Sequence, residues 1–183
     1  MMTRDLSSLL RMLGEEVPSE HLSDPLAFIF ADNFRCRVLC NVLDVVGSGT
    51  KVGLAALETC RSFLFSDFLT HIADERQGLF PLLLERTTPE DGVQDVIRRQ
   101  RTSFATVNRV ADELTRLEGG QWAVRKGVGV IRTFVAAERE HISIENVVVL
   151  PVARRRLSGE DLKWLGNVMR NHRARSPRAA LPS

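Results

Sequence analysis

Apolar residues recur at intervals of three and four through most of the chain, and this pattern predicts four long helices. Such intervals place apolar side chains on one face of a helix. Asp24-Pro25 and Thr88-Pro89 each combine a capping residue with the proline favoured in a first helical turn, and glycine-containing turns end the apolar stretches. The expected helices cover residues 25–47, 51–86, 90–117 and 122–151.

Proline interrupts the second of these stretches, because Pro81 lies inside it. Its ring removes a backbone hydrogen bond, so we expect a kink or a break there. Residues 1–22 predict a short amphipathic helix and a polar linker. Ser158 begins a last helix that passes Met169, and the basic tail 170–183 is expected to be disordered.

Four helices joined by short loops predict an all-α protein with an up-down-up-down four-helix bundle. The bundle is expected to span residues 23–157 as one domain, between an N-terminal segment, 1–22, and a C-terminal segment, 158–183. Residues 147–150 are all β-branched or aliphatic, but they continue a helical pattern and do not indicate a strand.

Composition is that of a soluble globular protein, with 44% hydrophobic and 26% charged residues. A net charge of +2 gives no indication of a nucleic-acid partner. No apolar run approaches the roughly 20 residues that a membrane helix needs, and charged residues interrupt the first 13 positions, unlike a signal peptide. Three cysteines cannot all pair within one chain, which favours reduced thiols and a cytoplasmic protein.

One short motif occurs twice, 70 residues apart. His71 and Glu75 run on to Pro81, and His141 and Glu145 run on to Pro151. Both copies read H-I-x-x-E-x-x-x-φ-φ-P, where φ is apolar. Positions i and i+4 share one face of a helix, so each pair can direct an imidazole and a carboxylate at the same metal ion. Surface hydrogen bonds are the simpler alternative, but the duplicated apolar context favours a shared interior site.

Other chemistry-bearing residues give weaker signals. Cys36 and Cys40 are also spaced i and i+4, which suits soft metal ligands or a redox pair, although buried cysteines more often pack as small hydrophobes. Arg154-Arg155-Arg156 suits phosphate binding or, more simply, a solvated basic end. We find no glycine-rich phosphate loop and no readable nucleophile arrangement, so we do not expect an enzyme.

The repeated motif and the phrases around 24–30 and 145–151 resemble the hemerythrin-like family, also called HHE cation-binding domains. The resemblance implies a four-helix bundle in which each half supplies one histidine from its first helix and an HxxxE pair from its second, together holding non-heme iron. His71, Glu75, His141 and Glu145 match the second-helix ligands. The first-helix histidines are replaced, one by Asn33 and the other by Gln100 or Arg101, so two of the usual six ligands are missing.

A divergent member of that family implies a regulatory or sensory protein with a partial metal site, holding iron, mononuclear or dinuclear, or zinc. The alternative is a metal-free scaffold that acts as a protein–protein interaction module in stress or redox signalling. If Arg101 points inward, its charge would replace a metal ion beside the two glutamates, and an inward Gln100 would not. Either role implies a regulatory protein partner and no membrane.

Overall fold

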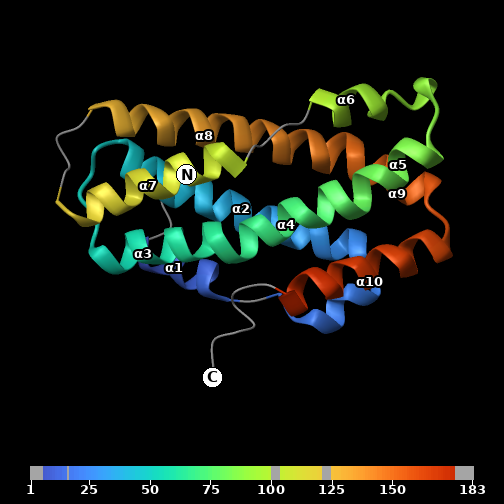
Figure 1. Ribbon diagram of the computed structural model, residues 1–183, viewed down its shortest axis with the longest axis horizontal. Coiled ribbons are helices and arrows are strands. Elements are labelled where there is room, and N and C mark those ends of the chain that lie inside the picture. Colours follow the sequence, from blue (N-terminus) through green and yellow to red (C-terminus); the bar gives the residue numbers. More distant parts are fainter. Residues whose placement is uncertain (1–5, 16, 100–103, 121–124, 176–183) are drawn as a thin grey trace.

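Helices make up nearly all of the structure. The computed structural model describes residues 6–15, 17–99, 104–120 and 125–175, and no strand occurs among them. The long helices lie side by side along the longest axis of the molecule (Figure 1). The predicted all-α class is therefore confirmed. Within these described ranges, no helix is both long enough and apolar enough to cross a lipid bilayer.

The first half begins with α1 (Leu6–Gly14), a 3-10 turn η1 (Ser19–Ser23) and α2 (Pro25–Gly47). The start of α2 is the predicted one: the Asp24 carboxylate accepts a hydrogen bond of 2.9 Å from the Ala27 N–H, and Pro25 occupies the first turn. Helix α2 is the central element, because α1, α8, α9 and α10 all pack against it.

The second predicted helix is continuous from Leu54 to Arg86. It consists of α3 (Leu54–Phe63), a π-helical turn η2 (Leu64–Phe68), α4 (Leu69–Asp74), a second π-helical turn η3 (Glu75–Leu79) and α5 (Phe80–Arg86). The predicted start at 51 was three residues early, and the predicted end at 86 is confirmed.

The expected break at Pro81 does not occur, because a π-helical turn stands directly before it. At the end of η3 the Phe80 N–H bonds to the Glu75 carbonyl, five residues back. The extra residue in this turn changes the backbone hydrogen bonds from i→i−4 to i→i−5. The change falls directly before Pro81, which has no N–H to donate. The second copy of the motif repeats the arrangement: the Leu150 N–H bonds to the Glu145 carbonyl, and Pro151 follows.

The second half contains η4 (Pro89–Asp91), α6 (Val93–Arg99) and α7 (Phe104–Glu118), then α8 (Arg125–Ile144), the π-helical turn η5 (Glu145–Val149) and α9 (Leu150–Arg156). The predicted helix 90–117 is thus described as α6 and α7, with residues 100–103 outside the described ranges. The last helix, α10 (Gly159–Arg175), begins after Ser158 as predicted.

The predicted disordered tail is wrong for residues 170–175, which are the final turns of α10. Side chains from these turns bond to buried carboxylates: His172 and Arg173 both contact Asp74. These contacts offset the cost of ordering a basic segment. Residues 176–183 lie outside the described ranges.

Buried apolar side chains form two separate clusters, and the boundary between them crosses three helices at equivalent levels. Along α2 the first cluster starts at Cys36 and the second ends at Ile29. The segment around Glu75 lies between Ile72 of the first cluster and Leu79 of the second, and the segment around Glu145 between Ile142 and Val149. The core is therefore divided by a layer that holds Asn33, Glu75 and Glu145.

Phe68 is a test of the first cluster, because its ring meets that of Phe134 edge to face with centroids 5.5 Å apart. We expect Phe68→Ala to lower the free energy of unfolding by about 3–5 kcal/mol, since it opens a cavity in a packed interior. Phe65→Ala, in the same π-helical turn but 39% exposed, is the matched control and should cost well under half as much. Urea denaturation followed by circular dichroism measures both, and equal losses would contradict the described packing.

Candidate metal centre

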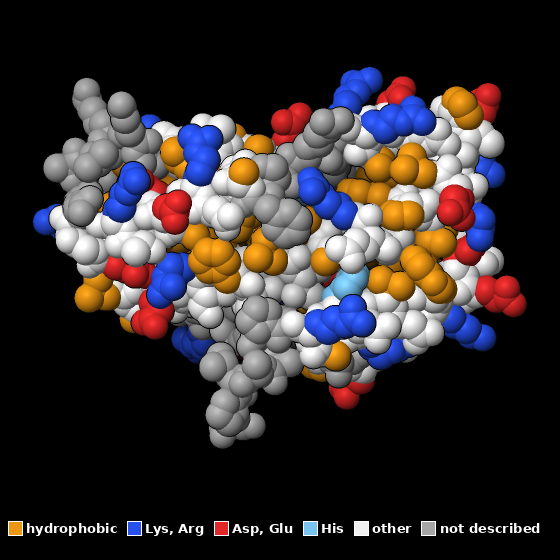
Figure 2. Space-filling model, in the orientation of Figure 1, with side chains coloured by type: hydrophobic (Ala, Val, Ile, Leu, Met, Phe, Trp, Pro, Cys, Tyr) orange, Lys and Arg blue, Asp and Glu red, His pale blue; other side chains and the backbone are white. Residues whose placement is uncertain are grey.

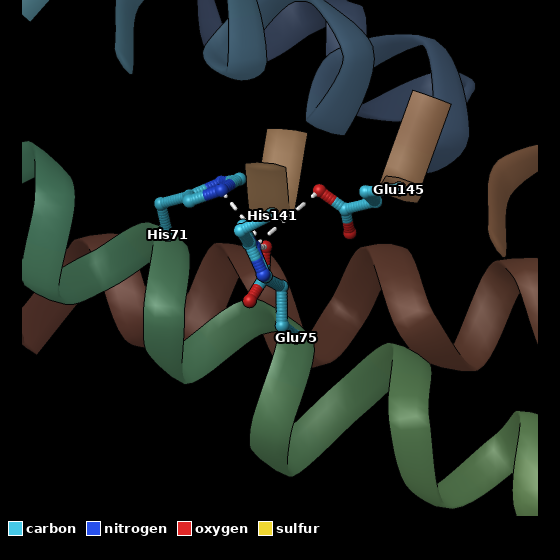
Figure 3. Close-up of side chains that lie close together, drawn as sticks. All are labelled: His71, Glu75, His141 and Glu145. Carbon is cyan, nitrogen blue, oxygen red and sulfur yellow. Dashed lines mark hydrogen bonds and ion pairs between the residues drawn. The ribbon is translucent and has the colours of Figure 1, made fainter. Parts of the chain in front are cut away.

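The two copies of the repeated motif meet in the interior of the molecule. His71 and Glu75 come from α4 and the start of η3, and His141 and Glu145 come from α8 and the start of η5 (Figure 3). All four side chains are buried, and each offers a ligand atom within 4.8 Å of the other three. The structure thus brings together the four residues that the sequence singled out.

Each half of the site is built by the same local geometry. Four residues separate the histidine from the glutamate, so both side chains leave one face of the helix. The glutamate is in each case the first residue of the π-helical turn, and its own carbonyl accepts the long backbone bond that closes this turn. The duplicated sequence therefore specifies a duplicated structure.

Glu75 is the centre of the contacts within the cluster. Its Oε1 atom lies 2.9 Å from His71 Nε2 and 3.0 Å from His141 Nε2. The contact with His141 has hydrogen-bond geometry, whereas the one with His71 is an ion-pair contact at a less favourable angle. Glu145 lies farther off, with its Oε2 atom 3.9 Å from His141 Nε2. One carboxylate oxygen is thus shared between two imidazoles.

Asn33 lies beside the cluster, next to Glu145. Its Nδ2 group donates hydrogen bonds to Glu145 Oε2 at 2.8 Å and to Asn146 Oδ1 at 3.0 Å. Among the described residues, four polar atoms at this centre lack a hydrogen-bond partner: Asn33 Oδ1, Glu145 Oε1 and both ring nitrogens of His71. Buried polar atoms are normally paired, so these atoms suit an additional ligand.

The charges of the cluster shift the pKa of every member. Burial alone would lower the pKa of both histidines, but the charge of Glu75 outweighs it and raises the pKa of His71 to about 10 and that of His141 to about 9. Burial opposes ionisation of Glu75 too, yet the two imidazoliums hold its pKa well below the usual range. Burial and the charge of Glu75 together raise the pKa of Glu145 to about 8.

The remaining predicted site residues contribute less. Cys36 and Cys40 are buried on α2 with free thiols, and burial and the charge of Glu138 raise the pKa of both, which disfavours the reactive thiolate. Gln100 and Arg101 lie outside the described residues. His21 is exposed on η1, away from the cluster.

Sequence reasoning missed several buried charged residues around the centre. Asp32 and Asp74 directly precede Asn33 and Glu75, and both are buried. Glu138 is buried on α8, one helical turn before His141. Glu138 could have been found from the sequence, because it lies one helical turn before His141 and therefore on the same face of the helix. No local pattern indicated that the two aspartates would be buried.

Two imidazoles and two carboxylates form a donor set that suits a divalent transition metal. Zinc accepts nitrogen and oxygen ligands in a four-coordinate site, and iron and manganese bind the same groups. The four residues fit such an ion, because their ligand atoms are buried, close together and incompletely paired. The cluster could therefore hold a metal ion.

No family model matches the sequence, and neither the curated proteins nor the solved structures include one that is significantly similar to it.

The shifted pKa values predict how the metal-free protein responds to alkali. Because the folded-state pKa values of His71 and His141 lie above the ordinary value of about 6.5, their protonation stabilises the fold most fully below that pH. This stabilisation is lost as the pH rises through about 9 and 10. We expect the free energy of unfolding of chelator-treated protein to fall between pH 7 and pH 10.

His71→Gln should reduce that pH dependence, because one of the two titrating imidazoles is gone. His21→Gln, at an exposed histidine, is the matched control and should leave the wild-type slope unchanged. Urea denaturation at intervals of one pH unit measures the three slopes. If the slope of His71→Gln equals that of the wild type, His71 does not carry the proton assigned to it.

Proposed function

We propose that the chain is a divergent hemerythrin-like protein in which His71, Glu75, His141 and Glu145 hold a single divalent metal ion, iron or zinc, and that it has a regulatory or sensory role. The observation that carries the proposal is the convergence of four buried ligand atoms within 4.8 Å of one another. These are the positions at which the sequence resembles that family.

The packing of the long helices supports a four-helix bundle. Helix α8 packs against both α2 and α7, and α7 packs against α3. Together with the short connections between successive long helices, these contacts agree with the antiparallel arrangement expected of such a bundle. The terminal helices α1 and α10 would then be additions to its surface.

One ion accounts for the donor set better than two. Paired metal ions stand roughly 3.5–4 Å apart and need ligands on both sides. Here the four ligand atoms form one compact group, all within 4.8 Å of one another. A bound ion would supply a fixed positive charge at the centre of this group.

Burial favours a regulatory role over turnover of an organic substrate. The exposed fraction of the four residues ranges from 0% for Glu145 to 8% for His141. A site of this kind responds to the ion itself or to a very small ligand. Binding or loss of the ion would change the positions of the helices that carry the ligands, and a partner could recognise that change. This is how a sensor works.

Elemental analysis of protein purified without added metal or chelator tests the proposal. We expect about one ion of iron, zinc or manganese per chain, because four ligands satisfy one such ion. His71→Ala and Glu145→Ala should each lose most of this metal, and His21→Ala should retain it. Two irons per chain would show a dinuclear centre instead, and no uptake of zinc(II) or of iron(II) under argon would rule out a metal site.

Proton release gives a second, independent measure of binding at these residues. With the pKa of His71 near 10 and that of His141 near 9, both imidazoles carry a proton at pH 7.5 in the metal-free protein. A metal ion displaces both, so we expect a release of about two protons per ion, with a further contribution from Glu145. Calorimetric titration with zinc(II) in buffers of different ionisation enthalpy measures the number. Release of fewer than one proton would place the ion elsewhere.

The sharing of Glu75 Oε1 between two imidazoles favours a second candidate function. In that arrangement one carboxylate pairs with both imidazoles without a metal ion, and the protein would be a metal-free scaffold for a protein partner in stress or redox signalling. This candidate predicts that chelator changes neither the metal content nor the stability of the purified protein. The elemental analysis above separates it from the metal-binding one.

A further inference from the structure

The C-terminal helix α10 packs against the segments that carry three of the residues at the candidate metal centre. It contacts α4 and η3, which hold His71 and Glu75, and α2, which holds Asn33 (Figure 1). Figure 2 shows that one histidine side chain reaches this face of the molecule and that a basic side chain lies next to it. The helix therefore covers the centre from one side.

Two side chains near the end of α10 hold it to buried carboxylates. Arg173 bridges two helices: its Nη1 group donates to Asp74 Oδ2 at 2.7 Å, and its Nη2 group to Asp32 Oδ2 at 3.2 Å. The same guanidinium lies over the ring of Phe28, 4.2 Å from its centroid. His172 Nδ1 is 2.8 Å from the other Asp74 oxygen.

Steric fit reinforces these ionic contacts. A Cβ atom added to Gly78 would lie 2.7 Å from Leu165 Cδ1, and one added to Gly166 would lie 3.0 Å from the Leu22 carbonyl. The absence of a side chain at both positions is what lets α10 approach so closely. Gly78 belongs to η3, the π-helical turn that begins at Glu75.

The contacts of α10 flank the residues of the metal centre in the sequence. Asp74 directly precedes Glu75, and Gly78 follows Glu75 by three residues. Asp32 directly precedes Asn33. Asp74 is fully buried, so its charge depends on the Arg173 guanidinium of α10 for pairing. When α10 leaves, the segments that position Glu75 and Asn33 lose a packed neighbour and the cation that contacts both Asp74 and Asp32.

We propose that α10 is a latch whose docking is coupled to the metal centre: the docked helix holds Glu75 and Asn33 in their binding positions, and a bound ion in turn keeps α10 docked. The inference rests on the proposed function, since it concerns regulation of that same site. Coupling of this kind is reciprocal, so the factor by which docking raises metal affinity equals the factor by which metal favours docking. Release of α10 would be the signal that loss of the ion sends to a partner.

Zinc(II) affinity of three variants of the full chain tests the coupling. Arg173→Gln removes the charge and the bridge between Asp74 and Asp32. Arg173→Lys keeps the charge but has a single amino group in place of the two guanidinium NH2 groups. Arg170→Gln is the matched control on the exposed face of the same helix. Groups that orient metal ligands from behind typically contribute tenfold or more to affinity. We expect about a tenfold loss for Arg173→Gln, a smaller loss for Arg173→Lys and less than a twofold change for Arg170→Gln.

Hydrogen exchange of the α10 amides in the wild-type protein provides the reciprocal measurement. Zinc(II) should slow exchange around Met169 and Arg173 by about the same tenfold factor. If Arg173→Gln loses its helical circular dichroism, the Arg173→Lys affinity and this wild-type exchange carry the test.

Two results would overturn the latch in distinguishable ways. In the first, wild-type protein binds zinc(II), but Arg173→Gln binds it as tightly as Arg170→Gln does, or zinc(II) leaves the exchange rates of the α10 amides unchanged. The metal site is then supported and its coupling to α10 is ruled out. If the wild type binds neither zinc(II) nor iron(II) under argon, the proposed function fails and the latch fails with it.

Discussion

The burial of four ionisable side chains in one place is the constraint on which the rest of the structure depends. An isolated charge in an apolar interior is prohibitively costly, and a buried pair persists only when the charges and hydrogen bonds are well matched. Here one oxygen of Glu75 contacts both imidazoles, and Asn33 donates to Glu145. The helices must therefore align so that residues 66 positions apart meet within hydrogen-bond distance, and the two apolar clusters form above and below that layer.

The alignment explains why the motif extends beyond its histidine and glutamate. A π-helical turn contains one more residue than an α-helical turn. The side chains that follow it therefore point in different directions from those that an uninterrupted α-helix would give. In both copies the turn begins at the glutamate and ends two residues before the proline, and the helix continues. The histidine before the turn and the glutamate that begins it face the centre, while Leu79 and Val149 at its end enter the second apolar cluster. Site, turn and proline thus act as one unit, and the chain uses it twice.

Sequence reasoning succeeded where the determining interactions are local. The spacing of His71 and Glu75, its repetition at His141 and Glu145, and the caps at Asp24 and Ser158 all act within a few residues, and the structure confirms each. It failed where the outcome depends on distant partners. Arg173 pairs with residues 99 and 141 positions away, which no local pattern encodes, and so its segment resembled a solvated tail. Of the kink or break expected at Pro81, the break does not occur, because a π-helical turn precedes the proline, and such a turn leaves no signature in apolar periodicity.

The long-range pairs of α10 extend the same electrostatic balance outward from the centre. Asp32 is shared between Arg173 and Arg35, and Arg35 in turn pairs with Asp67 at 2.7 Å and bonds to the Leu13 carbonyl of α1. Ion pairs therefore run from Arg173 of the last helix through Asp32 to Arg35, whose hydrogen bond to the Leu13 carbonyl reaches the first helix. Each carboxylate in this series is buried or nearly so, and withdrawing one cation leaves an unpaired charge in the interior. The Arg173 guanidinium is thus a requirement of the core, since it balances the aspartates that stand directly before Asn33 and Glu75.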